Sequence, residues 1–535
     1  MPRVKSFTQS MAWLHSWAGL ILGWLLFAIF LTGTLTIFDK EINWWSQPEL
    51  RDQQVTQQEA ARAAWNWLAR EHGDAEVWNI SLPTERAPVM SVSIGDNRRS
   101  GGKVLDPHSE ALVPVRESAG GNFLYHFHYT LHMPRTFGIW VVGLAAMAML
   151  TALVTGIVIH KRIFKDFFTF RPVKGRRAWL DGHNACAVLM LPFHLMITYT
   201  GLVIFVMIYM PAAVDALYDG NREAMFREAR PLAEKGAEPR QGNERRDGGR
   251  QGNERGPRMV EQAPAAEMLP LESFIGKAES VFGPGMVASM TISHPGRANA
   301  VVSLRPLLGS RIALTKGVEV RFDAVSGKLL QAPLEPRASA LTQQVMTGLH
   351  FAQFGGYPMR WLYFLCSGVS CAMIATGLVL FAMKQRLRTA EVNRGHTFLR
   401  VVDVLNIAVV AGLVLGCIGM LWANRLLPVE LAGRAGWEES LFFGIWGVSL
   451  LHAGWRQPGA AWREQLGVAA LLCLGLPLLG FLTQDAGAMD TTRLSLALVA
   501  VLIGLMLAWT AWRVGRPAAT NGVPHEPTQH LAGAG

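Results

Sequence analysis

Long apolar stretches recur along the whole chain, separated by polar segments of very unequal length. About eight of them are long enough to cross a hydrocarbon core of roughly 30 Å as helices of about 20 residues. We place these at 11–38, 136–160, 183–211, 357–383, 399–424, 439–455, 463–483 and 492–514. Because only helices and closed barrels satisfy the backbone in lipid, the pattern predicts an all-α polytopic membrane bundle.

Two of the polar segments carry the pattern of a small α+β domain. Each begins with a helical period and continues with alternating, strand-like runs: 57–72, then 76–82 and 88–94; and later 272–282, then 286–293, 298–304 and 318–323. A 3.6-residue period followed by a 2-residue period is typical of a helix followed by strands. The chain therefore looks duplicated, with the order helix, external α+β domain, helix occurring twice.

These patterns divide the chain into seven parts. They are a first membrane helix at 1–40, an α+β domain at 41–135, two helices with a basic loop at 136–211, a second α+β domain at 212–356, a helix at 357–383, an appended four-helix bundle at 384–514 and a tail at 515–535. Within the second domain, residues 227–265 are polar and repeat the hexapeptide Arg-Gln-Gly-Asn-Glu-Arg. Such a segment cannot bury a core, so we predict a disordered insertion.

The net charge of +10 does not indicate nucleic acid as a partner. Instead, the placement of the basic residues predicts how the chain is oriented in the membrane. Much of the Lys and Arg lies in short loops at 161–177 and 384–388, and short basic loops stay in the cytoplasm. We therefore expect both termini to be cytoplasmic and the α+β domains to lie on the outer side of the membrane. No convincing cleavage site follows the first apolar stretch, so we expect it to be a retained helix.

Histidines recur at the ends of the apolar stretches. His15 and His183 each lie eighteen residues before the glycine of a Thr-Gly pair, and His132 and His350 each follow a leucine just before a helix. An ionisable side chain is costly in a bilayer and is a functional hypothesis by default. We expect axial ligands for the iron of two b-type haems, His132 with His350 near the outer face and His15 with His183 near the inner face.

Four further histidines leave alternatives open. His160 has no counterpart in the second half and competes for the inner ligand role or supports the ligand shell. His194 lies about three turns into its helix and is an alternative ligand. His126 and His128 precede the outer pair. They would line an external substrate or metal site, or else be solvated at the membrane surface.

The cysteines and the absence of nucleotide-binding motifs limit the possible electron donors. All five cysteines lie in apolar stretches, without a Cys-x-x-Cys, which argues against zinc, iron–sulfur clusters and covalently attached haem. The chain has no Gly-x-Gly-x-x-Gly after a strand and no phosphate-binding loop, so no dinucleotide domain is indicated. A membrane quinol or a separate reductase is therefore the expected electron donor.

Residues 8–385 resemble the PepSY-associated transmembrane helix family. The motifs that carry the resemblance are Trp13-Leu14-His15, Leu31-Thr32-Gly33, Leu131-His132, Thr155-Gly156, His183 and Leu349-His350 in the helices, with Leu105-Asp106-Pro107 and Phe322-Asp323 in the PepSY-like external domains. The last four helices and the 227–265 insertion depart from the minimal form. The resemblance implies an inner-membrane reductase with two b-type haems that acts in ferric-siderophore iron acquisition.

Together these observations favour a membrane cytochrome that passes electrons to a periplasmic acceptor, most plausibly a ferric siderophore. Two other classes stay open. The PepSY-like domains would also suit a non-redox envelope protein that binds or restrains peptidases. Repeated helices also suit a transporter, although these repeats are parallel and the helices lack obvious paired charges at mid-membrane.

Overall fold

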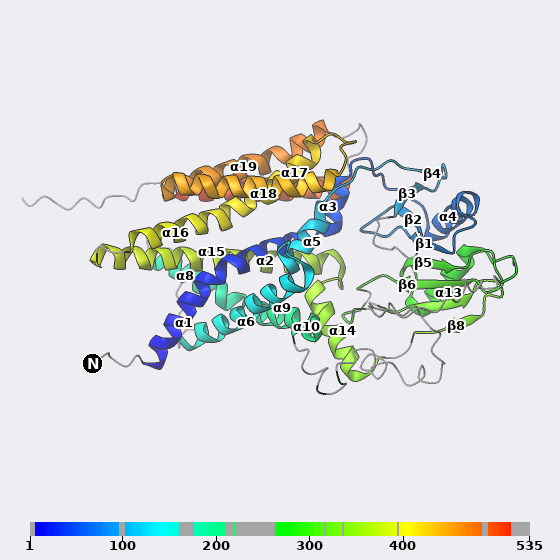
Figure 1. Ribbon diagram of the computed structural model, residues 1–535, viewed down its shortest axis with the longest axis horizontal. Helices are drawn as coiled ribbons and strands as arrows, with labels where there is room; N and C mark the ends of the chain where they lie inside the picture. Colours follow the sequence, from blue (N-terminus) through cyan, green and yellow to red (C-terminus); the bar gives the residue numbers. More distant parts are fainter. Residues whose placement is uncertain are drawn as a thin grey trace, which may run out of the picture.

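The computed structural model joins a long bundle of helices to a mixed α/β domain at one end (Figure 1). It describes residues 6–95, 102–159, 176–209, 216, 219, 263–309, 311–314, 317–333, 336–392, 395–483 and 490–514. Most of the predicted insertion, the predicted C-terminal tail and His160 lie outside these residues.

Five helical segments of the bundle are long and apolar enough to cross a membrane. They are α6 (Arg135–Ile159), α15 (Gly356–Val392), the continuous segment His396–Leu426, α19 (Pro458–Leu482) and α20 (Thr491–Val514). The segment His396–Leu426 consists of α16 (His396–Ile407), the π-helical turn η2 (Ala408–Gly412) and α17 (Leu413–Leu426). The protein is therefore a multi-pass membrane protein.

Two further spans are bent pairs of helices. The helix α1 (Phe7–Ile21) meets α2 (Gly23–Thr36) at 57°, and α8 (Arg176–Leu189) meets α9 (Leu191–Ile204) at 63°. Pro192 in the first turn of α9 explains the second break, since proline lacks an N–H and is best tolerated at a helix start. Within the described residues the count is thus five spans, or seven with the bent pairs, so the predicted eight is not confirmed. The helix expected at 439–455 is present as α18 (Arg434–Trp455) but is not among these spans.

The strands form one antiparallel sheet rather than two separate domains. Its order is β4-β3-β2-β1-β5-β6-β7-β8. The bounds are β1 Val77–Ser81, β2 Met90–Ile94, β3 Lys103–Asp106, β4 Ala111–Leu112, β5 Val287–Ser293, β6 Val301–Pro306, β7 Val320–Asp323 and β8 Leu329–Gln331. The two predicted units meet where β1 pairs with β5, with Ile80 opposite Met290. Sequence patterning identified the units but carries no signal for pairing between their first strands.

One helix from each unit packs beside this sheet. The helix α4 (Gln57–Glu71) begins at a capping box in which the Thr56 and Glu59 side chains satisfy each other's backbone N–H groups. The helix α13 (Leu271–Phe282) contacts α4, and their apolar faces share one buried core with the sheet. That core is fully closed at residues such as Ala64, Ile80 and Phe274, each at most 1% exposed.

Three short helices that the sequence did not predict lie between the sheet and the bundle. They are α3 (Asp39–Ser46), α5 (Gly120–Thr130) and α14 (Ala338–Phe351). A four-residue helix, α10 (Val206–Tyr209), follows α9. The chain leaves α5 through Leu131 and His132, which both have positive φ angles of 51° and 59°. Non-glycine residues rarely adopt this conformation, and it turns the chain sharply from α5 into α6.

The sheet domain is fixed to the bundle by an ion cluster on α3. The Arg86 side chain, from the loop between β1 and β2, donates hydrogen bonds to Asp39 at 3.2 Å and to Glu41 at 2.6 Å. Tyr357, at the start of α15, donates its hydroxyl to Glu41 at 3.0 Å. The arginine and both acceptor carboxylates are at least 80% buried, so this cluster orients the domain.

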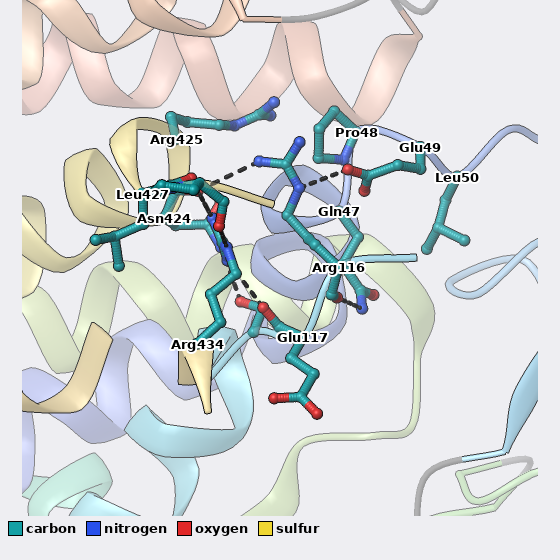
Figure 2. A network of polar contacts seen from close by, with 12 residues as sticks. Gln47, Pro48, Glu49, Leu50, Arg116, Glu117, Asn424, Arg425, Leu427 and Arg434 are labelled. Carbon is teal, nitrogen blue, oxygen red and sulfur yellow. Dashed lines mark hydrogen bonds and ion pairs between the residues drawn. The ribbon is translucent and has the colours of Figure 1, made fainter. Parts of the chain in front are cut away.

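A second polar network ties the appended helices to the segment that precedes α5 (Figure 2). Arg434 and Glu438 of α18 form a fully buried ion pair. Glu438 accepts the backbone N–H of Ala119 at 2.9 Å, and Arg434 donates to the carbonyl of Glu117 at 2.8 Å. Arg116 then pairs with Glu49 at 2.6 Å. The appended bundle therefore holds the start of α5 in place.

Candidate functional site: four histidines on paired helices

The imidazoles of His128 and His350 face each other near the sheet domain. His128 lies on α5 and His350 on α14, and their ring centroids are 6.1 Å apart with an angle of 32° between the planes. The His128 Nδ1 is 2.8 Å from the carbonyl of Ile29 on α2. The His350 Nδ1 is 3.1 Å from the carbonyl of Ile197 on α9. Each ring is thus fixed by the bent span that belongs to its own half of the chain.

His15 and His183 occupy the other end of the bundle. His15 lies on α1, at the end away from the sheet domain (Figure 1), and its Nδ1 is 3.0 Å from the carbonyl of Ala152 on α6. His183 lies on α8, and its Nδ1 is 2.9 Å from the carbonyl of Met373 on α15. Both side chains are half-buried, as are those of His128 and His350.

All four rings rest on the same local motif of the facing helix. The motif is an acceptor carbonyl, a threonine three residues later and a glycine in the next position. It occurs as Ile29, Thr32 and Gly33 against His128; Ala152, Thr155 and Gly156 against His15; Ile197, Thr200 and Gly201 against His350; and Met373, Thr376 and Gly377 against His183. Positions three and four apart share a helix face, so each motif presents one continuous seat to an imidazole.

The motif fixes which ring nitrogen carries the proton. A backbone carbonyl only accepts. The Thr155 hydroxyl donates to the carbonyl of Thr151 and lies 3.1 Å from the His15 Nδ1 with its oxygen available as an acceptor. Thr200 and Thr376 are arranged in the same way. Nδ1 must therefore be the N–H, which leaves Nε2 as the unprotonated nitrogen, the form in which histidine binds a metal.

The glycines make room for the rings. A Cβ on Gly33 would lie 2.7 Å from the His128 Nδ1, and one on Gly201 would lie 3.0 Å from the His350 Cε1. A Cβ on Gly377 or Gly156 would lie 3.1 Å or 3.4 Å from the Cε1 of its histidine. A side chain in these positions would push the imidazole off its acceptor carbonyl, most severely at Gly33.

The sequence led us to expect a pair of His132 and His350. In the structure these two side chains do not face each other. His132 lies past the end of α5, and its Nε2 is 3.8 Å from the Glu439 carboxylate. Its ring contacts Phe123 and Phe443. The two Leu-His motifs are therefore not structurally equivalent, because the turn at Leu131 and His132 directs His132 toward α18. His128, for which the sequence left open an external site or a solvated position at the membrane surface, lies opposite His350 instead.

The other candidate histidines have distinct surroundings. His194 is fully buried on α9, with Nε2 2.8 Å from the Ser370 hydroxyl of α15 and no partner for Nδ1 among the described residues. His126 is exposed, and its Nδ1 is bonded within its own helix, to the carbonyl of Asn122. His160 lies outside the described residues.

One signal in the sequence would have identified His128. The chain has five Thr-Gly pairs, at 32–33, 155–156, 200–201, 347–348 and 376–377. Apart from 347–348, they lie at corresponding places in the two halves, so the histidines that face them should also be spaced alike. His128 precedes Gly156 by 28 residues and His350 precedes Gly377 by 27, whereas His132 precedes Gly156 by only 24. The spacing of His128 therefore matches that of His350 more closely than the spacing of His132 does, but the shared Leu-His dipeptide favoured His132.

Aromatic side chains continue from the His128 and His350 pair toward the sheet side. Tyr125 lies three residues before His128 and Phe351 directly follows His350, and the centroids of these two rings are 6.3 Å apart. Tyr125 also contacts the exposed His126 at 5.6 Å. The pair is therefore connected to the protein surface by a short run of ring contacts.

A comparison with models of known protein families identifies the family of the chain. The model of the PepSY-associated TM region matches residues 12–384. That range contains all four histidines and all four Thr-Gly seats, and it ends before the appended helices. No curated protein matches the chain. The match covers well over half of the sequence, and the chain belongs to the PepSY-associated TM family.

Proposed function

We propose that this protein is a b-type haem cytochrome that carries electrons through the membrane to an acceptor on the sheet-domain side. The observation that carries the proposal is the facing pair of imidazoles, His128 and His350, with each Nδ1 committed to a backbone carbonyl. In a bundle, a haem takes its axial ligands from inward-facing histidines on different helices. His15 and His183 have the same seats and form the second candidate pair.

The first pair fits the spacing that a shared iron needs. Imidazole nitrogen binds metals at about 2 Å, so two imidazoles on one iron have centroids roughly 6 Å apart. The observed separation is 6.1 Å. The glycine seats add a second fit, because Gly33 and Gly201 leave the rings close against their helices. A bound haem would supply one-electron chemistry between Fe(III) and Fe(II).

The protein's own groups would set the properties of each site. The carbonyl and threonine acceptors at Nδ1 orient the ring and raise the basicity of Nε2. His15 is shared between the Ala152 carbonyl and Thr155, and His350 between the Ile197 carbonyl and Thr200. Among the described residues, the polar contact of the His128 ring is with the Ile29 carbonyl alone. The two histidines of the sheet-side pair therefore differ in the number of hydrogen-bond acceptors at Nδ1.

The acceptor that we propose is a ferric chelate of the siderophore class. Reduction weakens the hold of hard oxygen donors on iron, which is chemically useful for iron release. The support here is the exposed end of the run Tyr125 and His126, beside the sheet domain. With the positive-inside rule, that side is the periplasm of a bacterial inner membrane, and both termini are cytoplasmic.

The direct test is spectroscopic. The detergent-purified protein from haem-replete cells should give the reduced-minus-oxidised spectrum of low-spin b-type haem, and dithionite-reduced protein should be reoxidised by a ferric hydroxamate. A colourless protein would remove the proposal and favour a non-redox envelope protein. If dithionite reduces the haem but no ferric chelate reoxidises it, the protein is still a cytochrome, and the proposal that a ferric chelate is its electron acceptor is wrong.

A further inference from the structure

A cavity of about 350 Å³ lies between α1 and α15. Its residues come from the first turns of α1 and from the part of α15 that lies farthest from the sheet domain (Figure 1). Small-molecule sites typically have volumes of about 300–1,000 Å³. The cavity is therefore large enough for a single substituted ring.

The walls of the cavity are flat and aromatic. Trp13, Trp17 and Phe381 line it. The ring centroid of Trp17 is 6.4 Å from that of Trp13 and 5.4 Å from that of Phe381. Trp13 is 54% exposed, so one wall lies on the surface of the bundle, where a molecule dissolved in the bilayer has access. The Trp13 and Trp17 rings are tilted by 45° and the Trp17 and Phe381 rings by 73°, so the walls offer ring faces and ring edges to an aromatic ligand.

The rim of the cavity is polar and cationic. Gln9 and Ser16 of α1 and Lys384, Gln385 and Arg388 of α15 contribute to the lining. No Asp or Glu is among the lining residues of this cavity. Amide, hydroxyl and ammonium groups recognise ring hydroxyls, and the two cations favour a ring oxygen that is losing its proton.

The cavity adjoins the seats of His15 and His183. Ala12 and Ser16, which line it, lie within one helical turn of His15. Phe381 and Lys384 are four and seven residues past Gly377, which places them on nearly the same face of α15 as the seat of His183. Seven residues correspond to roughly 10 Å along a helix, a short distance for electron transfer.

We propose that this cavity is the site of a membrane hydroquinone that donates electrons to the His15 and His183 site. The inference rests on the proposed function, since it needs an electron-accepting haem at that pair. One hydroquinone loses two electrons, one at a time, to two ferric haem equivalents and becomes the quinone. Its two hydroxyl protons leave to water at the same face. Lys384 and Arg388 stabilise the intermediate negative charge on the ring oxygen.

The test uses the purified full-length protein with its haem and the short-chain analogue decylubiquinol. Haem reduction is followed by stopped-flow absorbance, with dithionite as a reductant that needs no site. The variants Lys384→Gln and Trp17→Ala are compared with Arg513→Gln, which removes a cation from the last turn of α20, outside the cavity. Losing a stacking or charge contact should raise the quinol KM about tenfold, with haem content unchanged. Arg513→Gln should behave as wild type.

Each outcome decides the inference. A tenfold rise in KM, with full reduction by dithionite, supports it. If dithionite reduces the wild-type haem but decylubiquinol does not, the inference fails, the proposed function stands, and a soluble reductase becomes the donor. A loss of haem in Lys384→Gln also overturns the inference, because the cation would then hold the acidic edge of the haem itself. Wild-type protein without haem overturns both proposals.

Discussion

The substitution Gly33→Ala is the most demanding test of the histidine seats. The added Cβ would lie 2.7 Å from the His128 Nδ1, while ordinary contacts begin at 3.4 Å. The ring must therefore move by about 0.7 Å, although its Nδ1 is held 2.8 Å from a carbonyl of the same helix. A lost hydrogen bond costs about 1 kcal/mol, and overpacking costs about 1–3 kcal/mol.

These terms give about 2–4 kcal/mol at the sheet-side site, which is roughly 30- to 1,000-fold in haem affinity. Alanine is the better helix former by about 1 kcal/mol, so α2 itself should not suffer. The other seats should follow the order of their clearances, Gly201 at 3.0 Å, Gly377 at 3.1 Å and Gly156 at 3.4 Å. Gly156→Ala should be close to neutral.

The assay is haem per chain by pyridine haemochrome, together with a redox titration. Gly19→Ala is the matched control, because a Cβ there meets nothing within 4 Å. Gly33→Ala should retain about one haem, and Gly19→Ala should retain two. If Gly33→Ala keeps both haems at wild-type midpoint potentials, His128 does not hold a haem and the reasoning from the seats is wrong.

Three further substitutions test the support of the site. Thr200→Val removes an acceptor 3.1 Å from an axial imidazole; the less basic ring should raise that haem's midpoint potential by roughly 20–40 mV in a redox titration, and an unchanged potential would contradict the tautomer argument. Glu438→Gln leaves the buried Arg434 guanidinium without its carboxylate; it should cost about 3–5 kcal/mol, seen as a lower thermal unfolding midpoint, and an unshifted midpoint would show that the network is dispensable. Burial alone raises the pKa of Glu41, but the hydrogen bond and charge of Arg86 outweigh burial and hold this pKa below 4.5. A carboxylate whose pKa is depressed in the folded state contributes stability above about pH 4.5, and this stability is lost as the pH falls through the folded pKa. Arg86→Gln should therefore increase proteolysis of the sheet domain at pH 7, and the difference from wild type should shrink below about pH 4.5. Equal cleavage of both proteins at pH 7 would contradict the role of the ion cluster.

Much of the fold follows from periodicity in the sequence. The ranges 57–72 and 272–282 are helices α4 and α13, and the alternating runs are strands in the predicted order. Pairing between β1 and β5 was not predictable, because strand alternation defines which face is buried but does not define the neighbour. The bends in the first and third spans also escaped prediction, since Leu22 and Met190 interrupt helices without changing the apolar pattern.

The sequence singled out three of the four histidines that occupy equivalent places in the structure; the haem chemistry assigned to them stays a prediction. His15, His183 and His350 occupy equivalent seats, although the Thr-Gly pair that each ring faces lies on another helix than the one that the sequence spacing used. His132 and His350 are not placed alike because α5, a short helix of 11 residues, is followed by two residues with positive φ angles, Leu131 and His132. Local backbone reversals of this kind depend on tertiary packing, and neither leucine nor histidine is a residue type that predicts a positive φ angle.

The central claim is that His128 and His350, rather than His132 and His350, hold a haem on the sheet side. The most direct measurement is haem per chain in three proteins, the wild type, His128→Ala and His132→Ala. We expect two b-type haems in the wild type, one in His128→Ala and two in His132→Ala. Two haems in His128→Ala, or the loss of one in His132→Ala, would contradict the account.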